Sequence, residues 1–351
     1  MRCLQDAFID PNIIHESVKA VLLVGGMGTR LRPLTYRIPK PLIPVMGKAL
    51  IMHVIDSVPA EVDEIIIPMS YKKNMMEEYL VRNRPRRKVT LVDEPAPLGT
   101  GGAVKNVEKY IDGQFLVING DSISSLDVAK FVEFHRAKNG IASISLWPVD
   151  DPTPYGVVDL DQDQRIRRFQ EKPKKEEAFS NLINAGAYAL EYEVLDHIGK
   201  GFVSMEREVF PRILDRGMYG MRFDGYWIDC GRREDLLRAF WTKMGKDARI
   251  VDKNSVIEGA QLNKPLVLRE KAVVAGSTVG PWAYVSERAI VGLRSRVENS
   301  VLLEDARIGA RCTIVDSIID AASGTFGVRL EMPNPDYRLP SGLKCKVIFI
   351  Q

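Results

Sequence analysis

Cysteine is scarce in this chain of 351 residues, and no two cysteines form a Cys-X-X-Cys pair. The four that occur are scattered, at Cys3, Cys230, Cys312 and Cys345. Closely spaced cysteines are typical of disulfide frameworks and structural zinc sites. Their absence argues against both, and it fits a reducing cytoplasm.

Long apolar runs and a surplus of one charge are missing as well. No apolar segment approaches the roughly 18 residues that a transmembrane helix needs, and the acidic residues within 1–17 are unlike a signal peptide. The 49 Lys and Arg nearly balance the 46 Asp and Glu, which leaves a net charge of +3. This balance does not indicate a nucleic-acid partner. We expect a cytoplasmic protein that binds neither membranes nor nucleic acids.

The chain is long enough for about two domains, and its hydropathy pattern changes near residue 250. Residues 1–18 form an extension that we leave unassigned. Residues 19–245 alternate short apolar runs with helical stretches, which predicts a catalytic domain of the α/β class with a Rossmann-like, mostly parallel mixed sheet. The expected strands are 20–24, 65–68, 89–94, 115–120, 141–147, 157–160, 184–190 and 220–223. The expected helices are 50–58, 74–81, 103–110 and 127–138.

A period of six residues dominates the C-terminal part. Its aliphatic members are Val267, Val273, Val279, Val285, Val291, Val297 and Leu303, and after a slip of one residue Ile308 and Ile314. Such a period is typical of a parallel β-helix, in which each turn stacks on the one below. It resembles the left-handed hexapeptide-repeat type. We predict this domain over 250–351 and leave the tail after about 321 unassigned; an antiparallel β-domain with accidental spacing is the alternative.

Glycine is concentrated directly after the first expected strand. The run GGMGTR covers residues 25–30, and exposed backbone N–H groups in such a loop can bind phosphate oxygens. It is not a Walker loop, because no lysine follows the glycines, nor a GxGxxG fingerprint, because Leu31 stands where the last glycine is needed. Arg30 and Lys40 could add positive charge. The loop is therefore either a phosphate site or a strand-end turn beside surface cations.

The longer run GGMGTRLRPLTYRIPKPLIPVMGKAL resembles the N-terminal signature of the sugar-1-phosphate nucleotidyltransferases, the nucleotide-sugar pyrophosphorylases. Only Ala49, where proline is usual, departs from it. Five further motifs follow in the family's order: EPAPLGTGG (94–102), NGD (119–121), EKP (171–173), NAG (184–186) and WIDCG (227–231). Within the family the chain looks most like the mannose-1-phosphate guanylyltransferases. Glucose-1-phosphate thymidylyl-, adenylyl- and uridylyltransferases share much of the pattern and remain open.

The resemblance implies a reaction in which a hexose 1-phosphate attacks the α-phosphorus of a nucleoside triphosphate and pyrophosphate leaves. Positioning and electrostatics would supply most of the catalysis. The residues implied as catalytic are Arg30, Lys40 and Lys172. Asp121 and Asp229 would hold one Mg²⁺ together. Without the family, each aspartate reads as a turn residue or helix cap.

The resemblance also implies two groups of binding residues. The nucleotide would contact Gly25, Gly26, Gly28, Thr29, Glu94, Gly99 and Thr100, with glycines 99–102 packing on base and ribose. The sugar phosphate would contact Gly156, Glu171, Lys172 and Asn184.

Two other kinds of protein share these motifs. A catalytically silent regulatory subunit should have lost some of the charged site residues, and none is lost. A two-headed enzyme with an acyltransferase β-helix would usually need a histidine base, and no histidine follows His197. We therefore expect the β-helix to build a homo-oligomer, with exposed Trp282 and Tyr284 as candidate anchors.

Overall fold

The computed structural model describes residues 18–321 and 324–326. The chain divides into two compact units between Lys243 and Met244. The predictions for residues 1–17 and for nearly all of the tail lie outside the described residues. Within the described residues, helices are too short or too polar to cross a membrane.

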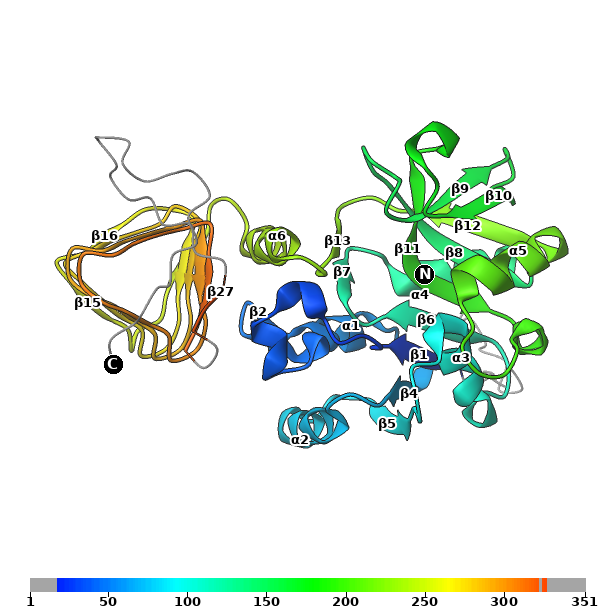
Figure 1. Ribbon diagram of the computed structural model, residues 1–351, viewed down its shortest axis with the longest axis horizontal. Coiled ribbons are helices and arrows are strands. Elements are labelled where there is room, and N and C mark those ends of the chain that lie inside the picture. The colour runs from blue at the N-terminus through cyan, green and yellow to red at the C-terminus, as the bar shows by residue number, and fades with distance from the viewer. Residues whose placement is uncertain (1–17, 322–323, 327–351) are drawn as a thin grey trace, which may run out of the picture. The chain divides into compact units, whose positions relative to one another are not determined.

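The first unit is built on a mixed sheet whose described strands number nine (Figure 1). Its strands are β1 (Val18–Leu23), β4 (Val62–Met69), β5 (Lys88–Asp93), β6 (Phe115–Asn119), β8 (Ala142–Pro148), β9 (Gly156–Leu160), β10 (Ile166–Glu171), β11 (Leu182–Leu190) and β12 (Met218–Arg222). The order β6-β1-β4-β5 is parallel throughout. β11 joins β6 and β8 in antiparallel pairs, so the predicted mostly parallel, mixed sheet is confirmed.

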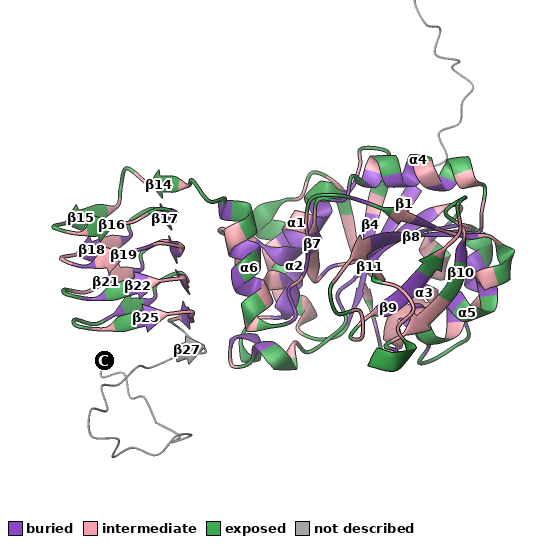
Figure 2. Ribbon diagram, turned by 90° about the horizontal axis from the view of Figure 1, so that it is seen from above, coloured by how far each residue is buried: buried purple, intermediate pink, exposed green. Residues whose placement is uncertain are grey.

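Helices cover both faces of this sheet. They are α1 (Leu50–Ser57), α2 (Lys73–Asn83), α3 (Gly99–Asn106), α4 (Val128–Lys138) and α5 (Phe210–Ile213). A further helix, α6 (Arg233–Met244), follows them in the chain. One core cluster includes side chains of α1, α2 and α4, and a second includes those of α3 and α5. The strands between these clusters are mostly buried, as Figure 2 shows for β1, β4, β8 and β11. Short apolar runs in the sequence therefore mark strands that are enclosed on both sides.

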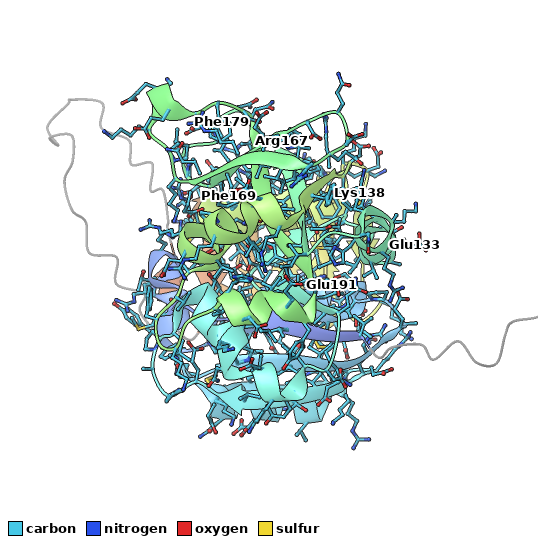
Figure 3. All side chains as sticks on the ribbon, turned by 90° about the vertical axis from the view of Figure 1, so that its right-hand side faces the viewer. Glu133, Lys138, Arg167, Phe169, Phe179 and Glu191 are labelled. Atoms are coloured by element: carbon cyan, nitrogen blue, oxygen red, sulfur yellow. The ribbon has the colours of Figure 1, made fainter. Side chains whose placement is uncertain are left out.

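A histidine on α4 forms a buried polar cluster in the first unit. His135 Nδ1 lies 2.8 Å from Ser143 Oγ, and its Nε2 lies 3.1 Å from Glu191 Oε1. Ser143 is fully buried, so this serine, histidine and acid set is structural. On the same helix Glu133 is exposed (Figure 3), whereas Lys138 lies over the Tyr219 ring and donates to the Asp163 carbonyl at 2.7 Å.

The burial of His135 predicts a loss of stability in mild acid. Burial, followed by the nearby Arg136 guanidinium, lowers the pKa of His135 to about 4. In the unfolded chain His135 takes up a proton below its ordinary pKa of 6.5, whereas in the folded chain it takes up this proton only near pH 4. The free energy of unfolding should therefore drop at pH 5 by on the order of 2 kcal/mol relative to pH 7.5. In His135→Gln, urea unfolding should show no such drop in the free energy of unfolding between pH 7.5 and pH 5. If the variant kept the pH dependence of the native protein, this prediction would be wrong.

The second unit is a three-sided left-handed parallel β-helix, as predicted, and Figure 1 shows its triangular section. One sheet contains β14 (Arg249–Val251), β17 (Leu266–Leu268), β20 (Ala283–Val285), β23 (Ser300–Leu302), β26 (Ile318–Asp320) and β27 (Gly324–Phe326). A second contains β15 (Val256–Glu258), β18 (Val273–Ala275), β21 (Ile290–Val291) and β24 (Arg307–Ile308). The third contains β16 (Gln261–Leu262), β19 (Thr278–Val279), β22 (Arg296–Glu298) and β25 (Thr313–Val315).

The predicted ladder is wrong at three members. Leu268, Val274 and Leu302 belong to the core of the coil, whereas their neighbours Val267, Val273 and Leu303 do not. The reason is the length of a turn. Leu266 pairs with Ala283, a step of 17 residues rather than 18, so a strict spacing of six cannot persist.

Tyr284 is also not the exposed aromatic that the sequence suggested. It is 1% exposed, although its neighbours Ala283 and Val285 are the ones in the coil interior. Trp282 is half-buried, with φ at 57°. Tyr284 is thereby excluded as an exposed interface anchor.

Candidate active site

The glycine loop opens at the carboxyl edge of the parallel strands. It follows β1, and Gly25 and Gly26 have open space where a Cβ would stand. Gly26 and Gly28 have φ angles of 137° and 58°, which favour glycine. At Gly28 a Cβ would lie 2.8 Å from Thr35 Cγ2, and Thr35 Oγ1 donates to the Gly28 carbonyl at 2.8 Å. The loop therefore keeps an exposed, tightly folded backbone that suits an anion.

A first cavity, the loop hollow, lies beside this loop. Its volume is about 370 Å³. Five residues predicted to bind nucleotide line it: Gly25, Gly26, Glu94, Gly99 and Thr100. Exposed apolar side chains stand around it as well, namely Met27, Tyr71 and Phe202. Gly28 and Thr29 continue the same loop toward Arg30.

Two polar side chains of the loop hollow are already engaged. Glu94 is buried, and its Oε1 accepts a hydrogen bond from the Leu98 N–H at 2.7 Å. The Thr100 hydroxyl donates to Glu206 Oε2 at 2.7 Å and accepts from the Met205 N–H at 2.9 Å. In the structure described here, both residues therefore organise the backbone around the hollow.

The glycines that follow Thr100 do not face the hollow. Gly101 and Gly102 donate their N–H groups to the Val203 carbonyl at 2.8 and 3.2 Å. A Cβ at Gly102 would collide with the Gly201 carbonyl oxygen. The expectation that glycines 99–102 all pack on base and ribose is thus wrong for these two, whose small size serves a backbone contact.

A second cavity, the charged cleft, lies on the other side of the loop and has a volume of about 710 Å³. It gathers seven of the predicted site residues from distant parts of the chain: Arg30, Asp121, Gly156, Glu171, Lys172, Asn184 and Asp229. The sequence did not predict Tyr188, Glu206, Arg232, Asp235 and Arg238, which also line it. These residues lie outside the short motifs or stand in helices without a spacing signal.

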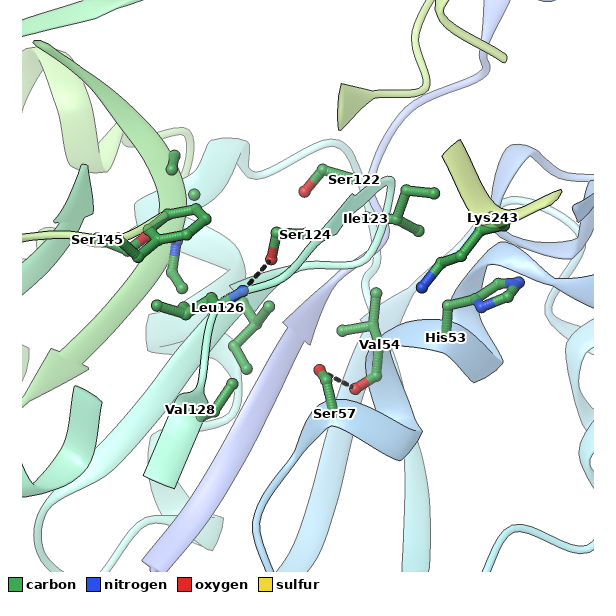
Figure 4. Close-up of a pocket in the computed structure, with 15 residues that line it drawn as sticks. His53, Val54, Ser57, Ser122, Ile123, Ser124, Leu126, Val128, Ser145 and Lys243 are labelled. Carbon is green, nitrogen blue, oxygen red and sulfur yellow. Dashed lines mark hydrogen bonds between the residues drawn. The ribbon is translucent and has the colours of Figure 1, made fainter. Parts of the chain in front are cut away.

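A small two-stranded sheet brings the two aspartates together. Asp121 directly precedes β7 (Ser122–Ser124), and Asp229 ends β13 (Trp227–Asp229). The strands are antiparallel, with Asp229 opposite Ser122, and the Cys230 N–H donates to the Asp121 carbonyl at 3.1 Å. Behind β7 a closed space of about 30 Å³, lined by Ser122, Ser124 and Ser145, has room for roughly one water (Figure 4).

Lys40 lies between the two carboxylates. Its Nζ is 2.7 Å from Asp121 Oδ2 and 3.5 Å from Asp229 Oδ1, and the residue is 7% exposed. Burial lowers the pKa of Lys40, but the two nearby carboxylates more than offset it, so the pKa is raised overall. Lys40 is therefore a fixed cation that contacts both aspartates, although it is not itself among the residues that line the cleft.

This geometry fits a divalent cation near the aspartates. Their side chains are 37% and 29% exposed, and they already converge on one positive charge. Carboxylate oxygens are the donors that Mg²⁺ prefers, and it usually keeps further positions for water and phosphate. Two protein ligands suffice for such a site, and no group of three or more His, Cys, Asp or Glu occurs among the described residues.

Arg30 and Lys172 of the EKP turn are two of the cations that line the cleft. A Cβ at Gly231 would lie 2.8 Å from Arg30 Nη2 and 3.0 Å from Asp229 Oδ1, which puts the guanidinium beside the second aspartate. Lys172 has φ at 49°, and its N–H donates to the Tyr155 carbonyl at 2.9 Å. Its side chain is 56% exposed and 3.5 Å from Glu171. Arg30 and Lys172 thus have different neighbours within the cleft.

Glu171 and Asn184 form the polar wall of the cleft. Burial, followed by the nearby Glu206, raises the pKa of Glu171. Glu171 pairs with Gly156 across β10 and β9, so both line one surface. Asn184 donates to the Tyr188 hydroxyl at 2.9 Å and accepts from the Gly186 N–H at 2.9 Å.

Comparisons with known proteins relate most of the chain to one family. The family model described as "Nucleotidyl transferase" matches residues 19–244. The chain is 36% identical over 315 residues to a probable mannose-1-phosphate guanylyltransferase 1 of Oryza sativa, covering 86% of each chain. It is 35% identical over 329 residues to the bifunctional protein GlmU of Methanocaldococcus jannaschii, covering 86% of this chain and 77% of that one. The structure of HddC from Yersinia pseudotuberculosis with GMP-PN is similar, with a TM-score of 0.54, 33% identity, and coverage of 64% and 98%.

Proposed function

Because the chain belongs to the nucleotidyl transferase family, we propose that it transfers the guanylyl group of GTP to mannose 1-phosphate and releases pyrophosphate. One observation carries the proposal: loop 25–30 borders both cavities, with Gly25 and Gly26 in the loop hollow and Arg30 in the charged cleft. A reaction between two anionic substrates needs two sites that meet at a cationic junction. The name of the rice relative and the GMP-PN of the Yersinia structure support mannose and guanine.

In this proposal the chain acts mainly by holding the reactants. The glycine loop binds the triphosphate through its N–H groups, and Arg30 lies where charge develops on the departing pyrophosphate. Asp121 and Asp229 hold Mg²⁺, which neutralises phosphate oxygens when bound. Lys40 fixes the two carboxylates in place. Glu171 accepts from sugar hydroxyls, and Lys172 pairs with the sugar phosphate.

A matrix of substrates tests the proposal. Five nucleoside triphosphates are combined with mannose and glucose 1-phosphates, and pyrophosphate release is measured with Mg²⁺ present. The highest kcat/KM should belong to GTP with mannose 1-phosphate. A preference for another base or for glucose would redirect the assignment to a thymidylyl-, adenylyl- or uridylyltransferase. The absence of turnover with every pair would favour a nucleotide-sugar-binding regulatory subunit.

Arg30 and Lys172 should affect different substrates. Lys172→Ala should chiefly raise the KM for the sugar phosphate, because its ammonium lies beside Glu171. Arg30→Ala should lower kcat and weaken nucleotide use, because its guanidinium lies beside Asp229. Each lost charge-assisted contact should cost about 1.5–3 kcal/mol. Steady-state kinetics with each substrate varied separately measure this. If both variants raised the same KM alone, this division of roles would be wrong.

We propose that the β-helix unit builds a homo-oligomer in the cytoplasm and does no chemistry of its own. No histidine follows His197 in the sequence, so an imidazole base is missing from the β-helix sequence. Regular strands leave flat outer faces that favour self-association. Light scattering of the full chain at micromolar concentration should give a dimer or larger species, and truncation after Gly245 should reduce it. A strictly monomeric full chain would overturn this proposal.

A further inference from the structure

One short segment contributes to both cavities. Residues 201–206 precede α5, and Phe202 lines the loop hollow while Glu206 lines the charged cleft. Glu206 lies in a π-helical turn, Met205–Val209. It belongs to none of the sequence motifs, and none of the roles assigned above uses it.

The Glu206 carboxylate joins the two cavities through hydrogen bonds. Its Oε2 accepts from the Thr100 hydroxyl at 2.7 Å and from the Ser204 hydroxyl at 2.8 Å. Its Oε1 accepts from the Tyr188 hydroxyl at 3.2 Å. Thr100 lines the loop hollow and Tyr188 lines the cleft. A single side chain therefore contacts one residue from each cavity.

The direction of these hydrogen bonds determines which atoms donate and which accept in the neighbouring groups. An ionised carboxylate only accepts, so each of its partners must donate to it. The Tyr188 oxygen is then left to accept from Asn184 Nδ2, at 2.9 Å. This fixes which end of the Asn184 amide is the donor and leaves its Oδ1 to accept from the Gly186 N–H. The orientation of Asn184 in the cleft is thus set by the Gly186 N–H and, through Tyr188, by Glu206.

Backbone contacts tie the same segment to the start of α3. The Val203 N–H donates to the Leu98 carbonyl at 2.8 Å, and the Val203 carbonyl accepts from the N–H groups of Gly101 and Gly102. The Met205 N–H donates to the Thr100 hydroxyl at 2.9 Å. Tyr188 is 0% exposed, so its ring has little freedom to choose another partner. A shift at Thr100 is therefore passed to Glu206 and on to Tyr188.

We propose that Glu206 is a positioning residue that couples the two substrate sites, so that a nucleotide in the loop hollow strengthens sugar-phosphate binding in the cleft, and the reverse. This rests on the proposed function of the two cavities. Each ligand orders its own end of the Thr100–Glu206–Tyr188–Asn184 chain. Whichever binds second finds the arrangement already formed, which gives positive coupling without a large structural change. Coupling of this kind is reciprocal.

Calorimetry on the full chain tests the coupling. The affinity of the α,β-methylene analogue of GTP is measured with Mg²⁺, with and without saturating mannose 1-phosphate. In the native protein the sugar phosphate should tighten nucleotide binding by about tenfold. In Tyr188→Phe, which removes only the hydroxyl, this ratio should fall to less than about twofold. If the substrate matrix identifies another pair, the analogue and sugar phosphate of that pair are used, so a wrong base or sugar leaves this test intact.

Matched variants separate coupling from simple loss of structure. Thr100→Val should lose the coupling from the nucleotide side, and Thr100→Ser, which keeps the hydroxyl, should restore it. Tyr219→Phe removes a hydroxyl from β12 and should keep the native ratio. Native protein that binds both ligands without mutual tightening would overturn the inference, as would a native ratio in Tyr188→Phe. Either result would leave the proposed reaction standing.

Discussion

Asp121→Asn should fold normally and lose turnover by on the order of 10²–10³-fold. The amide has the shape of the carboxylate but not its charge, so it binds Mg²⁺ poorly and is a weaker partner for Lys40. The Asp121 side chain is 37% exposed. The Cys230 N–H donates to the main-chain carbonyl of Asp121, so the substitution leaves this hydrogen bond in place and should preserve the fold. The measurement is kcat at saturating substrates over a Mg²⁺ titration, with a thermal melt as the folding check.

Asp235→Asn is the matched control for this prediction. Asp235 lines the same cleft but pairs with Arg238 at 3.2 Å, away from Lys40. Its neutralisation should therefore lower turnover far less than that of Asp121. Near-normal, chelator-insensitive activity in Asp121→Asn would remove that residue from the metal site.

Lys40→Met should be the most damaging single substitution, because it affects stability and catalysis together. Methionine fills the buried space but leaves Asp121 and Asp229 facing each other with no cation between them. Removing one partner of a buried charge pair costs about 3–5 kcal/mol; since both carboxylates are about a third exposed, we expect on the order of 2 kcal/mol. Turnover should drop at least about a hundredfold, because the carboxylates lose their fixed position.

Mg²⁺ gives this second prediction a distinctive readout. With the ammonium gone, two uncompensated carboxylates should attract a divalent cation even without nucleotide. Urea unfolding should therefore show that millimolar Mg²⁺ stabilises Lys40→Met more than it stabilises the native protein. Lys48→Met is the control and should change little, because Lys48 is 37% exposed and its partner Asp56 is 48% exposed. Native stability and activity in Lys40→Met would show that the buried ammonium is dispensable.

The sequence predicts which residues line the cleft better than it predicts which of them contact one another. Short motifs single out Asp121 and Asp229, which both line the charged cleft, because each stands at the end of an apolar segment. What unites them is the β7 and β13 pair, and strands of three residues are too short to show a period. No sequence pattern near Lys40 indicates its two partners, which lie 81 and 189 positions away. Glu206 depends on Thr100, 106 residues earlier, and nothing local marks it.

The β-helix shows a different limit of sequence reasoning. The repeat reveals the architecture, but Leu266, Val267 and Leu268 are all aliphatic, so spacing alone cannot say which of them face inward. A turn of 17 residues has one face shorter than the others, and a constant spacing of six therefore drifts. Tyr284 is buried on the outer side of its strand, which an alternating pattern cannot anticipate.

The length of the coil can change only in fixed increments. Most strand pairings repeat after 17 residues, as between Val256, Val273 and Ile290, and one face has a step of 18 from Thr278 to Arg296. Removing one whole turn would bring each strand onto the next copy of its own face and shorten the unit by about 4.8 Å, the spacing of neighbouring strands. Removing six residues would instead rotate every later strand onto a different face. Natural or engineered variants of different length should therefore differ by whole turns.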